Sequence, residues 1–147
     1  MLDKNILPYL LLNCYMIKYS KHYIIHKVIA EAGVTMKLLI AGSRSIKEYD
    51  LEKHIPDGTT MIITGGANGI DTLAEKYADK KHLSKLILRP QYKIYGRYAP
   101  LKRNEEMIEL CDIVLVIWDG HSKGTKHTIS YADKIGKRLI LITEPTE

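Results

Sequence analysis

The sequence has little cysteine. Its two cysteines, Cys14 and Cys111, form no Cys-x-x-Cys pair, and no group of histidine and cysteine has the spacing of a zinc site. This excludes a disulfide framework and the usual structural zinc sites, and it indicates a reducing compartment and no bound metal. Cys111 ends an apolar helical face, which predicts a small, buried core residue.

Long apolar runs are also missing, and none would span a bilayer. The stretch from Ile6 to Ile17 resembles the apolar core of a signal peptide. However, it has no basic start, and Lys-Tyr-Ser-Lys-His-Tyr follows it in place of a small-residue cleavage site. We therefore expect a cytoplasmic protein that has no membrane partner.

The composition is that of a globular domain with a mildly basic charge. The 147 residues are 46% hydrophobic and 27% charged, which predicts one packed domain of ordinary size. The net charge of +5 and the pI near 9.1 are compatible with anionic ligands. We expect the basic side chains to be spread over a solubilising surface and not gathered in one block, so the charge alone does not indicate nucleic-acid binding.

The first 35 residues differ from the rest of the chain. They hold four of the ten tyrosines and show no clean alternation or helical stripe, whereas a regular pattern begins at Met36. We expect residues 1–35 to be an N-terminal extension, either an over-extended start or a loosely attached appendage, and residues 36–147 to be the domain. The alternative is a helix at Leu7–Ala30 that packs on the domain.

From Met36 onward, short apolar runs alternate with amphipathic segments. The expected strands lie at residues 37–41, 59–64, 84–90, 112–120 and 138–143. The expected helices lie at residues 69–83, 100–111 and 124–136, with a short helix or turn at 46–55. This alternation predicts an α/β, Rossmann-like three-layer fold with a five-stranded, mainly parallel sheet and helices on both faces.

Polar or glycine-rich loops follow three of these strands, at residues 42–45, 65–71 and 118–125. In parallel sheets ligands bind at the carboxyl ends of the strands, where helix N-termini attract phosphate and glycine admits close approach. Each loop also has a plainer interpretation. The glycines suit a tight turn, Ser43 and Ser122 suit helix caps, and Asp71 suits a first-turn carboxylate. Trp118 suits either a base platform or a rim residue.

The segment after the third strand is rich in tyrosine and basic residues. It contains Tyr92, Tyr95 and Tyr98 together with Arg97 and Lys102. Aromatic and basic side chains suit a nucleotide base with its phosphate, or a single strand of nucleic acid. The alternative is a solvated basic helix face with tyrosines on its rim.

Four motifs carry a resemblance to a known family: MKLLIAGSRS, IITGGANGID, YGRYAPLKRNEEM and VIWDGHSKGTKHTI, which lie in this order within residues 36–142. Together they resemble the SLOG superfamily of Rossmann-like nucleotide-binding domains, in particular its YspA-like (cpYpsA-related) branch. The superfamily includes the LOG-type phosphoribohydrolases, the domain of DNA-processing protein A that binds single-stranded DNA, and sensors of nucleotide-derived signals in phage defence.

The resemblance implies a set of ligand contacts, to which the loop pattern adds Ser122. The set is Gly42, Ser43, Arg44, Gly65, Gly66, Gly69, Arg103, Asn104, Ser122, Gly124 and Thr125. The sequence departs from the LOG-type enzymes at Thr128, where those enzymes place a catalytic glutamate, and threonine cannot supply a carboxylate. Asp71 and Asp119 are the carboxylates left near the predicted edge, and with Arg103 they are the catalytic candidates.

These observations favour a domain that binds a nucleotide or a nucleotide-derived ligand through phosphate-cradling loops, as a sensor or a ligand-processing module, with no cofactor. One alternative is an enzyme of the nucleotide N-glycosidase type. Another, less favoured, is a single-stranded DNA-binding protein related to DNA-processing protein A. The resemblance also implies a homodimer, which SLOG relatives often form through their helices.

Overall fold

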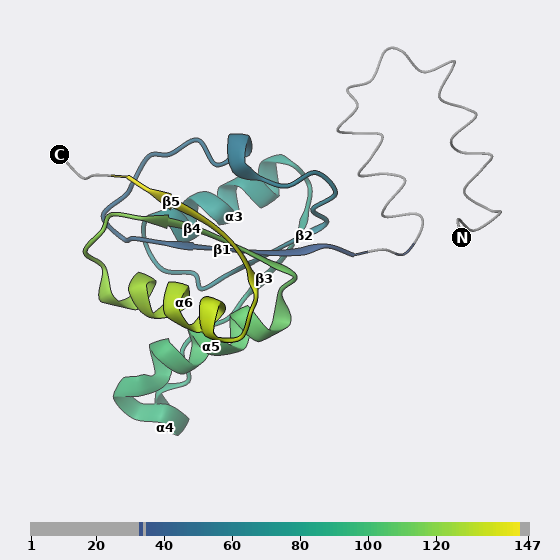
Figure 1. The fold of residues 1–147 in the computed structure, drawn as a ribbon. Coiled ribbons are helices and arrows are strands. Elements are labelled where there is room, and N and C mark those ends of the chain that lie inside the picture. The colour runs from purple at the N-terminus through teal and green to yellow at the C-terminus, as the bar shows by residue number, and fades with distance from the viewer. Residues whose placement is uncertain (1–32, 34, 145–147) are drawn as a thin grey trace, which may run out of the picture.

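A five-stranded sheet forms the centre of the computed structural model, which describes residue 33 and residues 35–144 (Figure 1). Its order is β3-β2-β1-β4-β5, and every neighbouring pair is parallel. The strands are β1 Lys37–Gly42, β2 Met61–Thr64, β3 Ser84–Ile87, β4 Ile113–Trp118 and β5 Arg138–Thr143. The expectations for the Leu7–Ala30 helix and for Cys14 lie outside the described residues, and the division at Met36 stays a prediction.

Three long helices cover the two faces of the sheet. Helix α3 lies on one face, and α5 and α6 lie on the other (Figure 1). Their bounds are α3 Ile70–Lys80, α5 Ala99–Leu110 and α6 Lys123–Lys134. The three-layer α/β, Rossmann-like fold predicted from the alternation of strands and helices is therefore confirmed, with a sheet that is parallel throughout.

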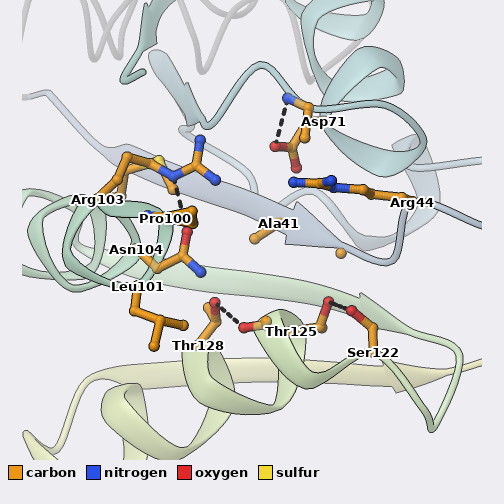
Figure 2. Close-up of a pocket in the computed structure, with 14 residues that line it drawn as sticks. Ala41, Arg44, Asp71, Pro100, Leu101, Arg103, Asn104, Ser122, Thr125 and Thr128 are labelled. Carbon is orange, nitrogen blue, oxygen red and sulfur yellow. Dashed lines mark hydrogen bonds between the residues drawn. The ribbon is translucent and has the colours of Figure 1, made fainter. Parts of the chain in front are cut away.

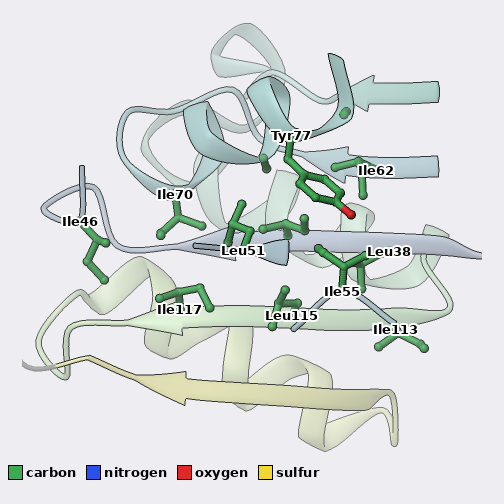
Figure 3. Packing of buried hydrophobic residues seen from close by; sticks show 13 residues of the cluster. Leu38, Ile46, Leu51, Ile55, Ile62, Ile70, Tyr77, Ile113, Leu115 and Ile117 are labelled. Atoms are coloured by element: carbon green, nitrogen blue, oxygen red, sulfur yellow. The ribbon is translucent and has the colours of Figure 1, made fainter. Parts of the chain in front are cut away.

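The core lies on both faces of the central strands. Ile113 through Ile117 of β4 are all buried, as expected for a strand that has helices on either side. On the α3 face, Leu51 and Ile55 from the β1–β2 connection complete the layer (Figure 3). The short helix or turn expected at residues 46–55 is mostly irregular chain, with one 3-10 turn, η2 Glu52–His54.

Cys111 is a core residue, as predicted. Only 2% of its surface is exposed, and its thiol donates a hydrogen bond to the Ile108 carbonyl oxygen. Burial raises the pKa of this thiol to about 11, so it stays neutral and inert at physiological pH.

The segment between β3 and α5 differs from the expected loop. It contains a short helix, α4 Tyr92–Tyr95, followed by a 3-10 turn, η3 Gly96–Tyr98. Helix α5 begins directly afterwards, with Pro100 in its first turn, where the missing N–H of proline has no consequence. In Figure 1 this segment extends away from the sheet below α5.

The strand order places a switch point between β1 and β4. From β1 the chain continues toward β2 and β3 on one side, whereas β4 and β5 lie on the other side. At such a point the loops leaving the two central strands diverge and open a crevice at their carboxyl ends. This crevice is the place where the fold itself favours a ligand site.

Candidate functional site

A cavity of about 90 Å³ lies at the carboxyl ends of β1 and β4 (Figure 2). Its polar wall comes from the loops after β1 and β4, from the first turn of α3 and from the first two turns of α5 and α6. The polar lining residues are Arg44, Asp71, Arg103, Asn104, Ser122, Thr125 and Thr128. Because sites that enclose a whole small molecule measure roughly 300–1,000 Å³, this cavity has room for one group of a ligand, such as a phosphate.

Arg103 forms a fixed part of the cavity wall, with 8% of its surface exposed. Its Nη1 donates hydrogen bonds to the carbonyl oxygens of Gly65, at 2.6 Å, and Leu88, at 3.2 Å. Its Nε donates to the side-chain oxygen of Asn104 at 3.0 Å. Burial lowers the pKa of Arg103, and the neighbouring Asp71 carboxylate opposes that change. Much of this guanidinium therefore serves the protein's own oxygen atoms.

Asp71 lies in the first turn of α3, with 5% of its surface exposed. Its Oδ2 accepts a hydrogen bond from the Ala67 backbone N–H at 3.1 Å. Burial raises the pKa of Asp71, and the Ala67 hydrogen bond and the charges of Arg103 and Arg44 oppose the rise. Among the described residues, Asp71 is the only carboxylate that lines the cavity, so of the catalytic candidates Asp71 and Arg103 lie at the cavity and Asp119 does not.

Arg44 is the exposed cation of the site. Figure 2 shows its guanidinium beside the Asp71 carboxylate, with Arg103 on the other side. Since its side chain reaches solvent and also lines the cavity, Arg44 can pair with an incoming anion without leaving a protein group unsatisfied.

Asp119 does not line the cavity, and its oxygen atoms are already engaged. Its Oδ1 accepts hydrogen bonds from the backbone N–H groups of His121, at 2.9 Å, and Ser122, at 2.8 Å. Its Oδ2 accepts from the Ser45 hydroxyl at 2.7 Å. These bonds, led by the one from Ser122, hold the pKa of Asp119 well below its usual range. Asp119 therefore shapes the loop before α6.

Helix α6 begins at the cavity wall. Ser122 is its N-cap, but the Ser122 Oγ accepts a hydrogen bond from the Thr125 hydroxyl at 3.0 Å and does not cap a backbone N–H. The first backbone N–H groups of a helix have no partner within it, which makes this end attractive to anions. A Cβ atom added to Gly124 would meet nothing within 4 Å, so the chain is open there.

Thr128 is the residue at which the sequence resemblance implied a departure from the LOG-type enzymes. It lines the cavity with 1% of its surface exposed, and its hydroxyl donates to the Gly124 carbonyl oxygen at 3.2 Å. Its hydroxyl is thus tied to the helix backbone, and no carboxylate lies at this point of the wall.

Three of the expected glycine contacts have partners inside the protein. A Cβ atom on Gly65 would collide with the Arg103 guanidinium, and one on Gly66 would lie 2.7 Å from Arg89 Nη1. One on Gly69 would lie 2.5 Å from the Ser43 carbonyl oxygen. None of these glycines lines the cavity.

Ser43 is likewise part of the frame and not of the cavity wall. It is fully buried, its N–H donates to the Ile117 carbonyl oxygen at 3.0 Å, and its hydroxyl accepts from the Asp119 N–H at 3.0 Å. Gly42 lines the cavity, and a Cβ atom there would also collide with the Ile117 carbonyl oxygen and with Ile70. Trp118 donates its indole N–H to the Ser122 carbonyl oxygen at 3.1 Å and lies outside the lining.

The structure therefore divides the predicted site residues into two groups. The residues at the cavity are Gly42, Arg44, Asp71, Arg103, Asn104, Ser122, Gly124 and Thr125. The residues behind it are Ser43, Gly65, Gly66, Gly69 and Asp119. Sequence reasoning missed Ala41, Ala67, Pro100, Leu101 and Met107. Pro100 and Met107 share one face of α5 with Arg103 and Asn104, at the spacing i, i+3, i+4 and i+7, so this helical stripe was the available signal.

The described residues contain neither a cluster of metal ligands nor a membrane-spanning helix. No group of three or more histidine, cysteine, aspartate or glutamate side chains is arranged to hold a metal ion in residues 33 and 35–144. Within the same residues, no helix has the length and apolar character needed to cross a membrane.

Comparison with solved structures finds a similar fold in a protein of Helicobacter pylori, DNA processing protein A. That structure is described as showing a unique single-stranded DNA binding mode. The TM-score is 0.55 and the identity 21%, and the match covers 76% of this chain and 67% of the other. No protein-family model and no curated protein matches the chain. At this identity the likeness supports the Rossmann-like fold.

Proposed function

We propose that this domain, of the SLOG type, binds a nucleotide or a nucleotide-derived ligand with one phosphate in the cavity at the β1–β4 switch point. The observation that carries the proposal is the meeting of an exposed guanidinium, Arg44, with the open start of α6 at Gly124. Both features favour an anion, and they come from the two loops that diverge at the switch point.

The residues divide the work between contact and support. Arg44 and the first N–H groups of α6 contact the phosphate, and the hydroxyls of Ser122 and Thr125 are within the same wall. Arg103 and Asn104 hold the opposite wall in place through their mutual hydrogen bond. Because the cavity is small, the ribose and base of the ligand lie largely outside it, over the loops.

A second candidate function is hydrolysis of the ligand, which Asp71 favours. A buried carboxyl with a raised pKa, in the cavity, is suited to general acid or base chemistry. The absence of a carboxylate at Thr128 places all of this chemistry on Asp71. Asp119, the other carboxylate candidate, already accepts hydrogen bonds from its own loop and from Ser45 in the loop after β1.

A third candidate is binding of single-stranded DNA, the ligand for which the Helicobacter pylori protein is described. A phosphate of a DNA strand has the same charge chemistry as that of a free nucleotide, so the cavity suits both. The volume of the cavity, about 90 Å³, limits its contact to one phosphate of either ligand.

Thermal shift measurements test the proposal. We expect nucleoside mono-, di- or triphosphates in large excess over the dissociation constant to raise the melting temperature, by an amount equivalent to about 2.7 kcal/mol at 100 times that constant. Arg44→Ala should abolish the shift, whereas Lys47→Ala, an exposed cation outside the cavity, should keep it. No shift with any nucleotide or with inorganic phosphate would exclude the proposal.

Hydrolysis is tested separately by release of free base from nucleoside monophosphates, followed by chromatography. Release that Asp71→Asn abolishes and Asp119→Asn retains would establish the enzyme. Ligand binding without release in the wild-type protein would leave the domain as a sensor.

A further inference from the structure

The segment Gln91–Tyr98, which contains α4 and η3, projects from the body of the domain (Figure 1). We call it the tyrosine projection. All eight of its residues are exposed, including Tyr92 at 60%, Tyr95 at 45% and Tyr98 at 54%. A soluble domain has no packing reason to order three aromatic rings in solvent, and exposed patches of this kind mark interaction sites.

The projection also lies within the most basic part of the chain. Residues 80–104 hold eight lysines and arginines and no aspartate or glutamate. The rest of the chain, with 14 basic and 17 acidic side chains, has a net charge of −3. The excess of basic residues is therefore concentrated in one stretch of the sequence, which the expectation that they are not gathered in one block did not anticipate.

Three of the basic side chains in or beside the projection form no ion pair within the described residues, although other cations of residues 80–104 do. Lys80 and Lys81 pair with Glu52, Lys85 pairs with Asp79, and Lys102 pairs with Glu105. In contrast, the described residues place no carboxylate within ion-pair distance of Arg89, Lys93 or Arg97. Arg89 donates instead to the Gly66 carbonyl oxygen at 2.7 Å.

The projection is ordered for flat contact. The Arg97 guanidinium lies over the Tyr98 ring, 4.9 Å from its centroid, and also donates a hydrogen bond to the Tyr98 hydroxyl at 2.8 Å. This contact holds the Tyr98 ring in place and keeps the Arg97 cation over one face of that ring. The short helix α4 places Tyr92 and Tyr95 three residues apart, on neighbouring positions of one turn.

The chemistry of this surface selects its partner. A second copy of the chain docking here about a two-fold axis would oppose identical basic side chains. An anionic membrane would favour large aliphatic side chains, but Ile94 is the only one in the projection. Exposed tyrosines among cations without an ion-pair partner suit a polyanion that has flat groups free to stack on them. Single-stranded nucleic acid has such groups, whereas the bases of a duplex are already stacked and paired.

We propose that the tyrosine projection binds single-stranded nucleic acid. Bases stack on Tyr92, Tyr95 and Tyr98, and Lys93 and Arg97 contact the phosphates. The projection contributes no residue to the cavity lining, so this site is separate from the proposed nucleotide site and stands without it.

Fluorescence anisotropy of the full chain with labelled 20-nucleotide oligo(dT), oligo(U) and a duplex of equal length tests the proposal. We expect single strands to bind more tightly than the duplex, with affinity falling as salt rises. Replacing all three tyrosines by alanine should weaken binding on the order of 100-fold, whereas replacement by phenylalanine should retain it. Arg97→Ala should reduce the salt slope by about 0.7.

Matched controls separate stacking from other causes. Ile94→Ala, on the projection, and Leu141→Ala, exposed on the far edge strand β5, should change affinity less than two-fold. Because the projection is exposed, the triple alanine variant should melt at the wild-type temperature, and it should keep any thermal shift with mononucleotides. Arg44→Ala should lose that shift and keep strand binding.

Several outcomes would overturn the proposal. These are no binding of either strand at low salt, equal binding by the triple alanine variant, or strand binding lost in Arg44→Ala alone, which would assign the strand to the cavity. Binding to vesicles of anionic lipid, or to an acidic polypeptide, that depends on Ile94 as strongly as on the tyrosines would assign the projection to a membrane or a protein.

Discussion

Two loops of this domain both contain glycine and both follow a strand, but the surroundings of their glycines differ. After β2, Gly65, Gly66 and Gly69 make room for the protein's own groups, namely two arginine side chains and the backbone of the loop after β1. After β4, Gly124 has no neighbour in the space a Cβ atom would fill, and that space opens on the cavity. The glycines after β2 therefore admit a close approach of the protein's own groups, whereas Gly124 leaves open space beside the proposed ligand site.

The carboxylates of the two loops differ in the same sense. Asp71 is buried, which raises its pKa, and it faces the cavity. Asp119 accepts two hydrogen bonds from its own loop and one from Ser45 in the loop after β1, and these bonds lower its pKa. One carboxylate therefore faces the proposed ligand cavity, and the other maintains the shape of the loop before α6.

The largest expected effect is on the loop after β2, through Arg103→Ala. This change removes one of the two cations near Asp71, Arg44 being the other, and it removes the donor to the Gly65 and Leu88 carbonyl oxygens. Because two carbonyl oxygens lose their donor, we expect a loss of about 2–5 kcal/mol in the free energy of unfolding, measured in urea by circular dichroism. The exposed Arg44→Ala should change it by less than about 0.5 kcal/mol.

The double variant Arg103→Ala/Asp71→Asn isolates the charge component of that loss. Since the double variant removes the charge of the Asp71 carboxylate together with the Arg103 cation, it should be more stable than Arg103→Ala alone. Equal stability losses in Arg103→Ala and Arg44→Ala would mean that Arg103 does not support the loop.

The next effect concerns Gly69→Ala. Gly69 has a φ of +77°, which side chains other than glycine rarely adopt, and its Cβ atom would lie 2.5 Å from the Ser43 carbonyl oxygen. We expect destabilisation of at least about 2 kcal/mol in urea, because the neighbour is backbone and cannot move aside. A variant as stable as the wild type would show that this loop has free space after all.

The sequence predicted the frame of this molecule well because the frame depends on local patterns. Apolar runs such as Ile113–Ile117 and the spacing within α3 are set by burial on two faces or one. The site was predicted only in part. That Gly65 serves Arg103, 38 residues away, depends on tertiary packing that no local pattern records. The helix α4 was missed because its side chains are all exposed and give no apolar stripe.

A smaller effect is expected for Asp119→Ala, which removes acceptors for the N–H groups of His121 and Ser122. Loss of such a carboxylate costs about 1 kcal/mol. Because the folded pKa lies below the ordinary value of 3.8, this stabilisation is present above that pH and is lost as pH falls through the folded pKa. The difference between wild type and variant should therefore be full at pH 7 and shrink below pH 4. If the difference in the free energy of unfolding did not depend on pH, the effect of Asp119→Ala would come from packing and not from the charge of the carboxylate.

The smallest effect on stability, and the most direct view of the loop after β4, is expected for Gly124→Ala. Gly124 is the second residue of α6, where alanine is a better helix former, so the free energy of unfolding should stay unchanged or rise by up to about 1 kcal/mol. The added methyl group occupies the open space at the cavity and should weaken the thermal shift with nucleotides. A loss of stability in Gly124→Ala would show that the protein's own packing requires glycine here, as it does at Gly69. An unchanged thermal shift would move the phosphate away from the start of α6 and leave Arg44 as its main contact.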